Sequence, residues 1–248
     1  MNPFSLSEKT ILITGASSGI GKQTALTLSG LGAKLIITGK NEARLKECFS
    51  QLDENQHRHF CADLTDLNQL SALTEQLPPL NGLVYCAGIW KSTPIKFLQT
   101  ETTLELFQLN FMAAQALVSN LLRQKKILPG ASIVFVTSIA AQFPYKGSAA
   151  YAASKAALES FSKTLSLEVA HQKIRSNCIA PAMVQTPMYE QTKEKLSGKL
   201  MHQHTNQYPL GTGKPVNIAN AIAFLLSDAS EWMTGTTLQM DGGLNVGS

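Results

Sequence analysis

The sequence of 248 residues is 44% hydrophobic and only 15% charged, with a formal net charge of +4. It is apolar enough to bury a sizeable core, as one large α/β domain or two small ones. Its few charges are scattered, which argues against a nucleic-acid partner, and the run Arg123-Gln124-Lys125-Lys126 is typical of a solvated helix end.

The N-terminal sequence and the apolar runs predict a cytoplasmic protein, and the spacing of its cysteines and histidines predicts no metal site. The start, MNPFSLSEKT, lacks a charged segment followed by an apolar core, so no signal peptide is expected. No apolar run approaches the roughly 20 residues of a membrane span. The four cysteines show no CxxC spacing, and the five histidines lack partners at ligand spacing, so we expect no metal site.

Strand-like and helix-like patterns alternate along the whole chain. Apolar, partly β-branched runs predict buried strands at 9–14, 34–39, 57–62, 82–88, 131–138, 174–180 and 237–242. Helical spacing predicts helices at 19–31, 41–53, 66–77, 100–127, 148–171 and 215–228. This alternation predicts a single α/β domain over 1–248, a Rossmann-type doubly wound parallel sheet of about seven strands with helices on both faces.

The segment 181–214 does not fit either pattern. It contains Pro181, Pro187, Pro209, Gly211 and Gly213 among polar residues, and it is long for a connection within a compact domain. We expect an irregular substrate loop or lid that closes over a site, with a flexible insertion as the alternative.

The first strand is followed by a glycine-rich turn and an amphipathic helix. Gly15, Gly19 and Gly21 have the spacing GxxxGxG, which allows a tight turn and a close approach of backbone to a pyrophosphate at the helix N-terminus. Three nearby hydroxyls could bind phosphate or cap that helix: Thr14, Ser17 and Ser18. The position after the first strand of a βαβ unit makes this a strong dinucleotide signal.

The end of the second strand bears on the choice between NADP and NAD. An NAD site needs a carboxylate there for the ribose hydroxyls, whereas a 2′-phosphate needs a cation and no acid. The strand ends in Gly39-Lys40-Asn41, so the sequence favours NADP(H) over NAD(H). The alternative is that Lys40 only solvates a loop.

The stretch YAASK places a phenol and an ammonium one helical turn apart, among small residues. Tyr151 and Lys155 share a helix face, and a positive charge beside a phenol favours the phenolate and lowers its pKa. This would bring proton exchange closer to neutral pH, where general acid catalysis works best. The alternative is a core tyrosine beside a lysine that extends to solvent.

Six short motifs in order resemble the short-chain dehydrogenase/reductase family, in its compact single-domain branch. They are TGASSGIG (14–21), CAG (86–88), Asn110 in FQLNF, Ser138 in VFVTS, YAASK (151–155) and MDGG (240–243). The resemblance covers nearly the whole chain and implies an enzyme acting on CH–OH or C=O groups. Members of this size include 3-oxoacyl-thioester reductases, and the family commonly forms homotetramers or dimers.

The resemblance assigns four catalytic residues. Tyr151 would be the general acid/base, Lys155 would bind the nicotinamide ribose, and Ser138 would hydrogen-bond the substrate carbonyl. Asn110, expected inside the helix 100–127, would hold a water that relays protons from Lys155. The structural alternatives are a turn cap for Ser138 and a backbone-bonded helical residue for Asn110.

The resemblance also implies a cofactor-binding set. Asp63-Leu64 matches an adenine-contacting pair, with a helix N-cap as the alternative for Asp63, and Ile179, Pro181 and Thr186 match the segment that holds the nicotinamide. The full set comprises Gly15, Ser17, Ser18, Gly19, Ile20, Gly21, Gly39, Lys40, Asp63, Leu64, Cys86, Ala87, Gly88, Tyr151, Lys155, Pro181, Val184 and Thr186. Apolar substrate walls are expected from Phe143, Tyr145, Met183, Met188 and Tyr189.

Three departures from the family pattern are visible. Cys86 stands where an asparagine is common and cannot copy its amide, and Ala182 replaces a glycine after Pro181. Ser18 stands where NADP-specific members often carry a cation, which leaves Lys40 as the clear partner of a 2′-phosphate. The sequence thus predicts an NADP(H)-dependent oxidoreductase with a small-molecule substrate. The alternatives are an NAD-dependent dehydrogenase of sugar, steroid or hydroxy-acid alcohols, or a non-catalytic NADP(H) sensor.

Overall fold

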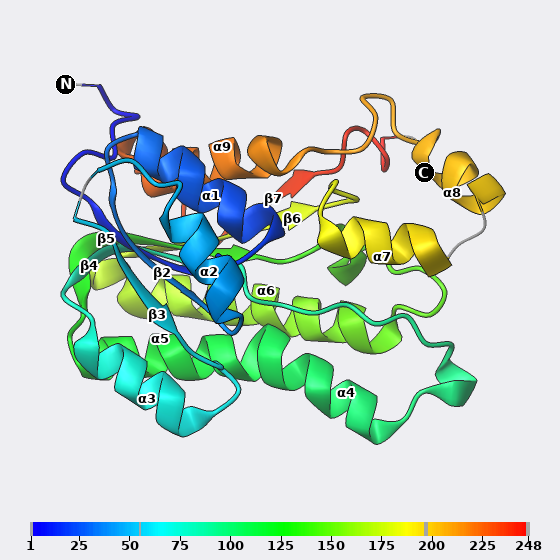
Figure 1. Ribbon diagram of the computed structural model, residues 1–248, viewed down its shortest axis with the longest axis horizontal. Coiled ribbons are helices and arrows are strands. Elements are labelled where there is room, and N and C mark those ends of the chain that lie inside the picture. Colours follow the sequence, from blue (N-terminus) through cyan, green and yellow to red (C-terminus); the bar gives the residue numbers. More distant parts are fainter. Residues whose placement is uncertain (1, 55, 196–197, 247–248) are drawn as a thin grey trace.

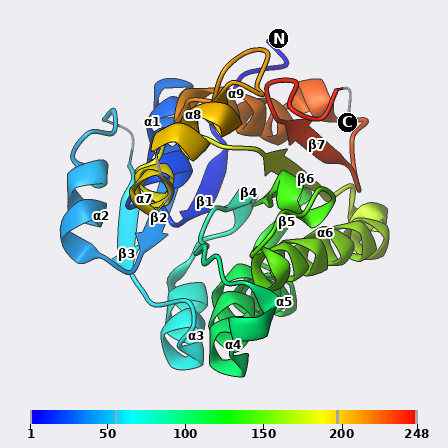
Figure 2. The same ribbon diagram turned by 90° about the vertical axis from the view of Figure 1, so that its right-hand side faces the viewer.

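One parallel sheet forms the centre of the molecule. The computed structural model describes residues 2–54, 56–195 and 198–246. Within them, seven strands lie in the order β3-β2-β1-β4-β5-β6-β7, and every neighbouring pair is parallel (Figures 1 and 2). The strands are β1 (Thr10–Thr14), β2 (Lys34–Gly39), β3 (Arg58–Cys61), β4 (Leu80–Tyr85), β5 (Ile127–Val136), β6 (Arg175–Pro181) and β7 (Thr237–Met240). The predicted doubly wound fold is confirmed.

Helices cover both faces of the sheet. One face carries α1 (Gly19–Gly30), α2 (Glu42–Phe49) and α9 (Pro215–Leu226), and the other carries α3 (Leu67–Gln76), α4 (Thr100–Phe107), α5 (Ala113–Arg123) and α6 (Ala149–Val169) (Figure 1). Two further helices, α7 (Pro187–Lys195) and α8 (Gly198–Thr205), lie beyond one end of the sheet (Figure 1).

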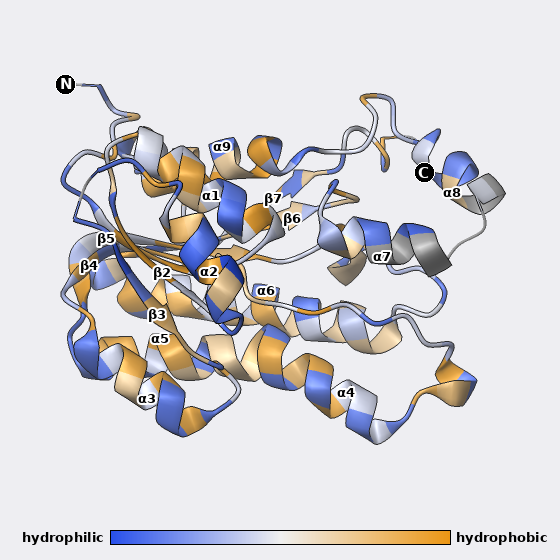
Figure 3. Ribbon diagram, viewed as in Figure 1, coloured by the Kyte–Doolittle hydropathy of each residue, from blue (hydrophilic) through white to orange (hydrophobic). Residues whose placement is uncertain are grey.

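The central strands are apolar on both sides because both sides are covered. In β1, Ile11 and Ile13 pack with the α1, α2 and α9 layer, while Leu12 between them packs with the α3, α5 and α6 layer. A strand buried on both faces needs a continuous apolar run rather than alternation. Figure 3 shows the result as a hydrophobic sheet between helices whose outer surfaces are hydrophilic.

The sheet order reverses between β1 and β4, which fixes the position of the site. From β1 the chain builds outward to β2 and β3, then returns to the other side of β1 and continues through β4 to β7. Loops after β1 and β4 therefore diverge to opposite faces. In open α/β sheets ligands bind in the crevice that this divergence leaves at the carboxyl ends of the strands.

The helix expected at 100–127 is interrupted. The structure has α4, then a π-helical turn over Gln108–Met112, then α5, and the chain is already in β5 at Ile127. The apolar spacing continues across the interruption, so periodicity cannot reveal the extra residue of a π turn. Such turns are often found at functional sites, and this one carries Asn110.

The segment 181–214 is more regular than the sequence analysis expected. Thr186 caps α7, because its Oγ1 accepts a hydrogen bond from the backbone N–H of Tyr189 at 3.3 Å, and Pro187 is the first helical residue. Threonine followed by proline is a helix-start signal, because proline is favoured at the first helical position. The proline that indicated a loop thus begins a helix. Residues 196–197 of this segment lie outside the described residues.

Two strands also end or begin differently from the expected ranges. β4 ends at Tyr85, so Cys86, Ala87 and Gly88 lie in the loop that follows it. β5 ends at Val136, so Ser138 lies beyond the strand and caps the 3₁₀ turn Ile139–Ala141, where its Oγ accepts from the Ala140 N–H at 3.2 Å. Both shifts move these residues out of the sheet and into the crevice.

Candidate active site

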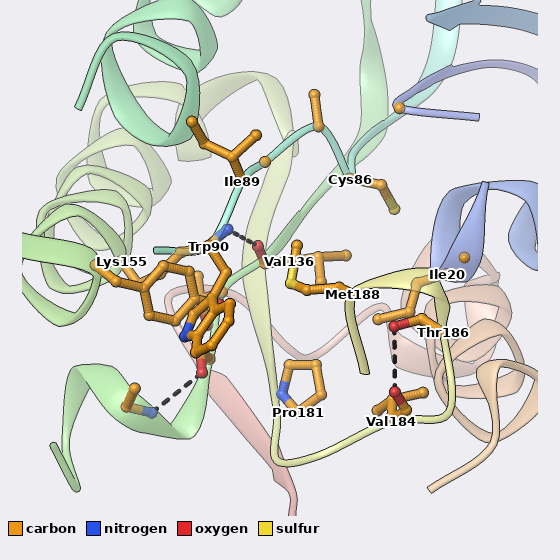
Figure 4. A pocket seen from close by; sticks show the side chains of 18 of the residues that line it. Ile20, Cys86, Ile89, Trp90, Val136, Lys155, Pro181, Val184, Thr186 and Met188 are labelled. Atoms are coloured by element: carbon orange, nitrogen blue, oxygen red, sulfur yellow. Dashed lines mark hydrogen bonds between the residues drawn. The ribbon is translucent and has the colours of Figure 1, made fainter. Parts of the chain in front are cut away.

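A single large cavity lies at the carboxyl ends of the strands. Its volume is about 1030 Å³, and it is lined by residues that follow β1 to β6. The predicted cofactor-binding residues line it with the exception of Ile179. Ser138, Tyr151 and Lys155 also line it, whereas Asn110 does not. In Figure 4, Ile20, Val184 and Thr186 occupy one side of this pocket, and Trp90 and Lys155 occupy the other.

The glycine turn is shaped by backbone contacts that leave no room for a side chain. A Cβ at Gly21 would overlap the carbonyl oxygen of Gly15, and a Cβ at Gly15 would lie 2.8 Å from the backbone nitrogen of Ala87. Gly15 also has φ of +65°, a left-handed conformation that glycine adopts without penalty. The turn thus presents bare backbone to the cavity at the N-terminus of α1. Ser18 is the N-cap residue of α1, but its side chain makes no capping hydrogen bond.

The hydroxyl of Thr14 has a structural role instead of binding a ligand. It is fully buried and accepts hydrogen bonds from the backbone N–H groups of Cys86 and Ala87, both at 3.2 Å. This joins the end of β1 to the loop after β4, so the loop is held although Cys86 has no amide. Burial raises the pKa of the Cys86 thiol to about 12, which keeps that side chain neutral.

Lys40 and Asp63 meet at the far end of the cavity. Lys40 Nζ lies 2.6 Å from Asp63 Oδ2, and the lysine side chain remains 78% exposed. The other carboxylate oxygen accepts from the backbone N–H and the hydroxyl of Thr65, at 3.0 and 2.7 Å. The hydrogen bond with Lys40, followed by those with Thr65, lowers the pKa of Asp63. The N-cap of α3 is Asp66 and not Asp63, so the structural alternative for Asp63 is wrong.

Tyr151 and Ser138 face the cavity together. Tyr151 is 9% exposed and lies on the first turn of α6, and both it and Ser138 line the cavity. Burial raises the pKa of Tyr151 to about 12, and among the described residues only the Ser138 hydroxyl opposes this shift. The expected lowering by Lys155 is therefore absent in the structure described. The reason is that burial destabilises the phenolate by more free energy than the neighbouring groups supply by stabilising it.

Lys155 is buried, and no carboxylate of the residues described by the structure pairs with it. It is 4% exposed, and its Nζ donates one hydrogen bond to the Val136 carbonyl at 2.9 Å. Burial lowers the pKa of this lysine to about 8. An ammonium has three donors, so two remain for a ligand in the cavity. The positive charge of Lys155 is thus held inside the cavity by its bond to Val136.

Asn110 lies behind the cavity and not in it. Its Oδ1 accepts from the Ile89 N–H at 2.9 Å, and its Nδ2 donates to the Ile89 carbonyl and to the Ser154 hydroxyl, both at 3.0 Å. The side chain thus fixes the loop after Gly88 against α6. A Cβ at Gly88 would lie 3.1 Å from Asn110 Oδ1 and 3.3 Å from Lys155 Nζ, so glycine there lets the two groups approach the same backbone.

A buried carboxylate that the sequence analysis missed braces the turn carrying Ser138. Glu159, on α6 one turn after Lys155, is 5% exposed. It accepts a hydrogen bond from the Thr137 hydroxyl at 3.0 Å and another from the Gln142 amide at 3.2 Å. These two partners flank Ser138 in sequence, so Glu159 holds both ends of the turn. A glutamate on a helix gave no signal of this, because its partners come from another segment.

The opposite side of the cavity is apolar and aromatic. All five expected wall residues line it: Phe143, Tyr145, Met183, Met188 and Tyr189. The sequence analysis missed Trp90, His204 and Tyr208. The Tyr208 hydroxyl lies 3.2 Å from His204 Nε2 and accepts from the Met183 N–H at 3.4 Å, which ties the end of α8 to the loop after β6. The one available signal was for Trp90, an aromatic residue two positions after the turn glycine Gly88.

Two kinds of site are not found among the residues with assigned positions. In those ranges, no group of three His, Cys, Asp or Glu side chains is placed to ligate a metal ion. Nor does any helix within them combine the length and the apolar character needed to cross a bilayer.

Comparisons with known proteins agree with this geometry. A family model described as enoyl-(acyl carrier protein) reductase matches residues 15–245. The 3-oxoacyl-(acyl-carrier-protein) reductase FabG of Rickettsia bellii is 37% identical over 240 residues, covering 96% of this chain and 98% of the relative. The human (3R)-3-hydroxyacyl-CoA dehydrogenase is 30% identical, covering 94% of each chain. A short-chain type dehydrogenase/reductase from Mycobacterium ulcerans superposes with a TM-score of 0.89 at 28% identity, covering 97% of this chain and 90% of the other.

Proposed function

Because this chain belongs to the short-chain dehydrogenase/reductase family, we propose that it is an NADP(H)-dependent oxidoreductase with Tyr151 as its general acid/base. Members of the family act on CH–OH and C=O groups with a nicotinamide cofactor. The reaction proposed is hydride transfer between nicotinamide and a carbonyl or secondary alcohol carbon. One observation carries this proposal: a single cavity is lined by the bare glycine turn and by Ser138, Tyr151 and Lys155.

The residues of the cavity fit a dinucleotide. A Cβ at Gly15 or Gly21 would collide with backbone, so this turn must be tight, and it opens at the N-terminus of α1, where unpaired N–H groups favour a pyrophosphate. Asp63 and Leu64 would contact the adenine end, Lys155 the nicotinamide ribose, and Pro181, Val184 and Thr186 the nicotinamide. When bound, the nicotinamide would supply or accept the hydride.

The protein's own part in the reaction is orientation and proton handling. The Ser138 hydroxyl accepts from the Ala140 N–H, which fixes its oxygen, and its own proton would be donated to a carbonyl oxygen of the substrate. Tyr151, kept neutral by burial, would donate its proton to that same oxygen as charge develops on it. Lys155, whose Nζ donates to the Val136 carbonyl, would orient the nicotinamide ribose beside this pair. Asn110 would then support proton return through a water, besides fixing Ile89.

Lys40 supports NADP(H) over NAD(H). β2 ends at Gly39 with no acid, and Lys40 lines the cavity with a side chain that is largely exposed. Lys40 is paired with Asp63, so a 2′-phosphate would have to share the lysine with that carboxylate. If Asp63 kept the lysine, the alternative of an NAD-dependent alcohol dehydrogenase would be favoured.

A non-catalytic sensor is less consistent with a cavity that retains Ser138, Tyr151 and Lys155.

The proposed substrate class is an acyl thioester with a 3-oxo group. The relatives named above act on 3-oxoacyl or 3-hydroxyacyl thioesters, and the apolar walls suit an acyl chain. We also propose one domain over 1–248, acting in the cytoplasm as a homodimer or homotetramer without nucleic acid or membrane. Exposed apolar side chains on the long helices support self-association: Leu104, Met112 and Leu167.

Absorbance of NADPH and NADH during incubation with a panel of ketones and 3-oxo esters tests the proposal. We expect oxidation of NADPH with at least one carbonyl compound and a lower KM for NADPH than for NADH. Tight NADPH binding without turnover of any carbonyl or alcohol would instead favour the sensor. A preference for NADH would favour the NAD-dependent alternative.

A further inference from the structure

Two aromatic side chains meet at the mouth of the cavity in a hydrogen bond that the proposed mechanism does not use. Trp90 Nε1 lies 2.6 Å from the Tyr145 hydroxyl oxygen, and both residues line the cavity. Trp90 comes from the loop after β4, whereas Tyr145 comes from the loop before α6, six residues before Tyr151. Figure 4 shows Trp90 on the same side of the pocket as Lys155.

The chemistry of the two groups decides which way the phenolic proton points. The indole N–H is a donor only, so in this bond the Tyr145 oxygen must be the acceptor. Its own proton therefore has to point away from Trp90, toward another acceptor. Burial raises the pKa of Tyr145, and the Trp90 bond opposes this shift, so the phenol stays protonated at neutral pH. Tyr145 is thus a hydrogen-bond donor with a fixed oxygen.

The backbone on both sides of this pair is held in place. Ser148, fully buried, accepts from the Tyr145 N–H at 3.0 Å and donates to the Tyr145 carbonyl at 2.7 Å. The two loops are also joined directly, because the Thr93 N–H donates to the Gly147 carbonyl at 2.9 Å. A donor positioned this firmly loses little entropy when it binds a ligand.

Tyr145 lies close enough to the catalytic phenol to reach the same substrate. Tyr145 and Tyr151 line the same cavity, together with Ser138. Phe143, Met183 and Met188 line the same cavity and offer no charged group to a ligand. A substrate held at Ser138 and Tyr151 by its reacting carbonyl would therefore meet one more fixed donor.

We infer that the Tyr145 hydroxyl, oriented by Trp90, donates a hydrogen bond to a second oxygen of the substrate a few bonds from the reacting carbonyl. This rests on the proposed function and makes Tyr145 a specificity-determining residue and Trp90 its positioning residue. A 3-oxo ester or thioester has such an oxygen in its acyl carbonyl. A simple ketone has none, so the Tyr145 hydroxyl, on a side chain that is 49% exposed, would donate to water instead.

The test compares ethyl acetoacetate with 2-pentanone, which lacks the second oxygen, in wild type and Tyr145→Phe. We expect the ratio of kcat/KM for the ester to that for the ketone to fall about tenfold in the variant, mainly through KM. The value for 2-pentanone should stay within about twofold. Trp90→Phe should lower the same ratio less, because the donor remains but its direction is freed. Trp232→Phe, which removes an indole that is 98% exposed, is the matched control.

A binding measurement separates this inference from the proposed function. The chain has two tryptophans, so in the Trp232→Phe background the fluorescence is that of Trp90 alone. Titration with ethyl acetoacetate without cofactor should quench it, with a midpoint about tenfold higher when Tyr145→Phe is added. Weaker binding of ethyl acetoacetate in Tyr145→Phe, with no turnover by either protein, would refute the proposed reductase activity but support Tyr145 as a hydrogen-bond donor. Turnover with equal losses for ester and ketone, or no preference for the ester in either measurement, would overturn the inference.

Discussion

The two sides of the cavity are built on different principles. On the nucleotide side, the turn between β1 and α1 is shaped by backbone against backbone, with Gly15 and Gly21 where a Cβ would collide. On the substrate side, side chains form hydrogen bonds with distant segments. The Trp90 indole bonds to the Tyr145 hydroxyl, and the Tyr208 hydroxyl bonds to the backbone N–H of Met183. The comparison teaches that the first side is encoded locally by residues that must be small, whereas the second depends on partners far apart in the chain.

Tyr151 lies where the two sides meet, and its substitution should have the largest effect. Tyr151→Phe removes the proton donor but keeps the ring, so turnover should fall by about 10²- to 10⁴-fold while the NADPH dissociation constant stays within about twofold. Steady-state rates and a fluorescence titration of NADPH measure the two quantities. Near-full activity on a verified substrate would show that another group is the acid.

The nucleotide side should be intolerant of a single methyl group. Gly21→Ala places a Cβ onto the Gly15 carbonyl, so the turn must shift, and we expect a loss of about 1–3 kcal/mol in unfolding free energy and at least about tenfold weaker NADPH binding. Denaturant unfolding and titration calorimetry measure these.

Gly30→Ala, at the other end of α1, is the matched control. Its Cβ would approach Asp53 Oδ2 no closer than 3.7 Å, an ordinary contact. Alanine is the better helix former, so this variant should be as stable as wild type or slightly more stable. If both variants behaved alike, the shape of the turn would not depend on backbone contact.

Lys40→Ala tests whether a side chain also matters on the nucleotide side. Removing the only cation proposed for the 2′-phosphate should weaken NADPH by roughly tenfold and NADH by less than about threefold. Lys46→Ala is the control, because Lys46 is also exposed and paired with an acid, Glu42, but does not line the cavity. Equal losses of NADPH and NADH in Lys40→Ala would refute the phosphate contact.

The smallest expected effect is a pH dependence of the free energy of unfolding that comes from His57. This residue bonds to the start of β2 and does not line the cavity. His57 Nδ1 accepts from the Leu35 N–H at 3.0 Å, which requires a neutral ring, and burial lowers the His57 pKa below 6.5, opposed by Asp53. Above about pH 6.5 the His57 ring is neutral in both the folded and the unfolded chain, so its full contribution to stability is present. As the pH falls from there through the folded-state pKa, the unfolded state gains the proton first and stability declines.

Thermal unfolding of wild type and His57→Gln between pH 8 and 5 measures this. The variant should be less stable at pH 8 but should lose less on acidification, with a difference of a few degrees at most. Parallel curves for the two proteins would assign the acid sensitivity to other groups.

The sequence analysis placed the cofactor side well because its determinants are local. Each of these motifs, the glycine turn, the strand ends and YAASK, spans only a few residues. The cofactor-binding residues predicted from them line one cavity. It was wrong about the continuous helix at 100–127 and the irregular segment 181–214, because a π turn leaves the apolar pattern intact and Pro187 signals a helix start as well as a loop.

By itself the sequence determined the sheet, its two helical layers and the phenol–ammonium pair, because hydrophobic period and short-range spacing act within one element. Only the tertiary structure decided the state of those groups. It buried Tyr151 so that its pKa rises to about 12, paired Lys40 with Asp63, turned Asn110 toward Ile89 and set Trp90 against Tyr145. Desolvation and contacts between distant segments exist only once the chain is packed, so no local pattern records them.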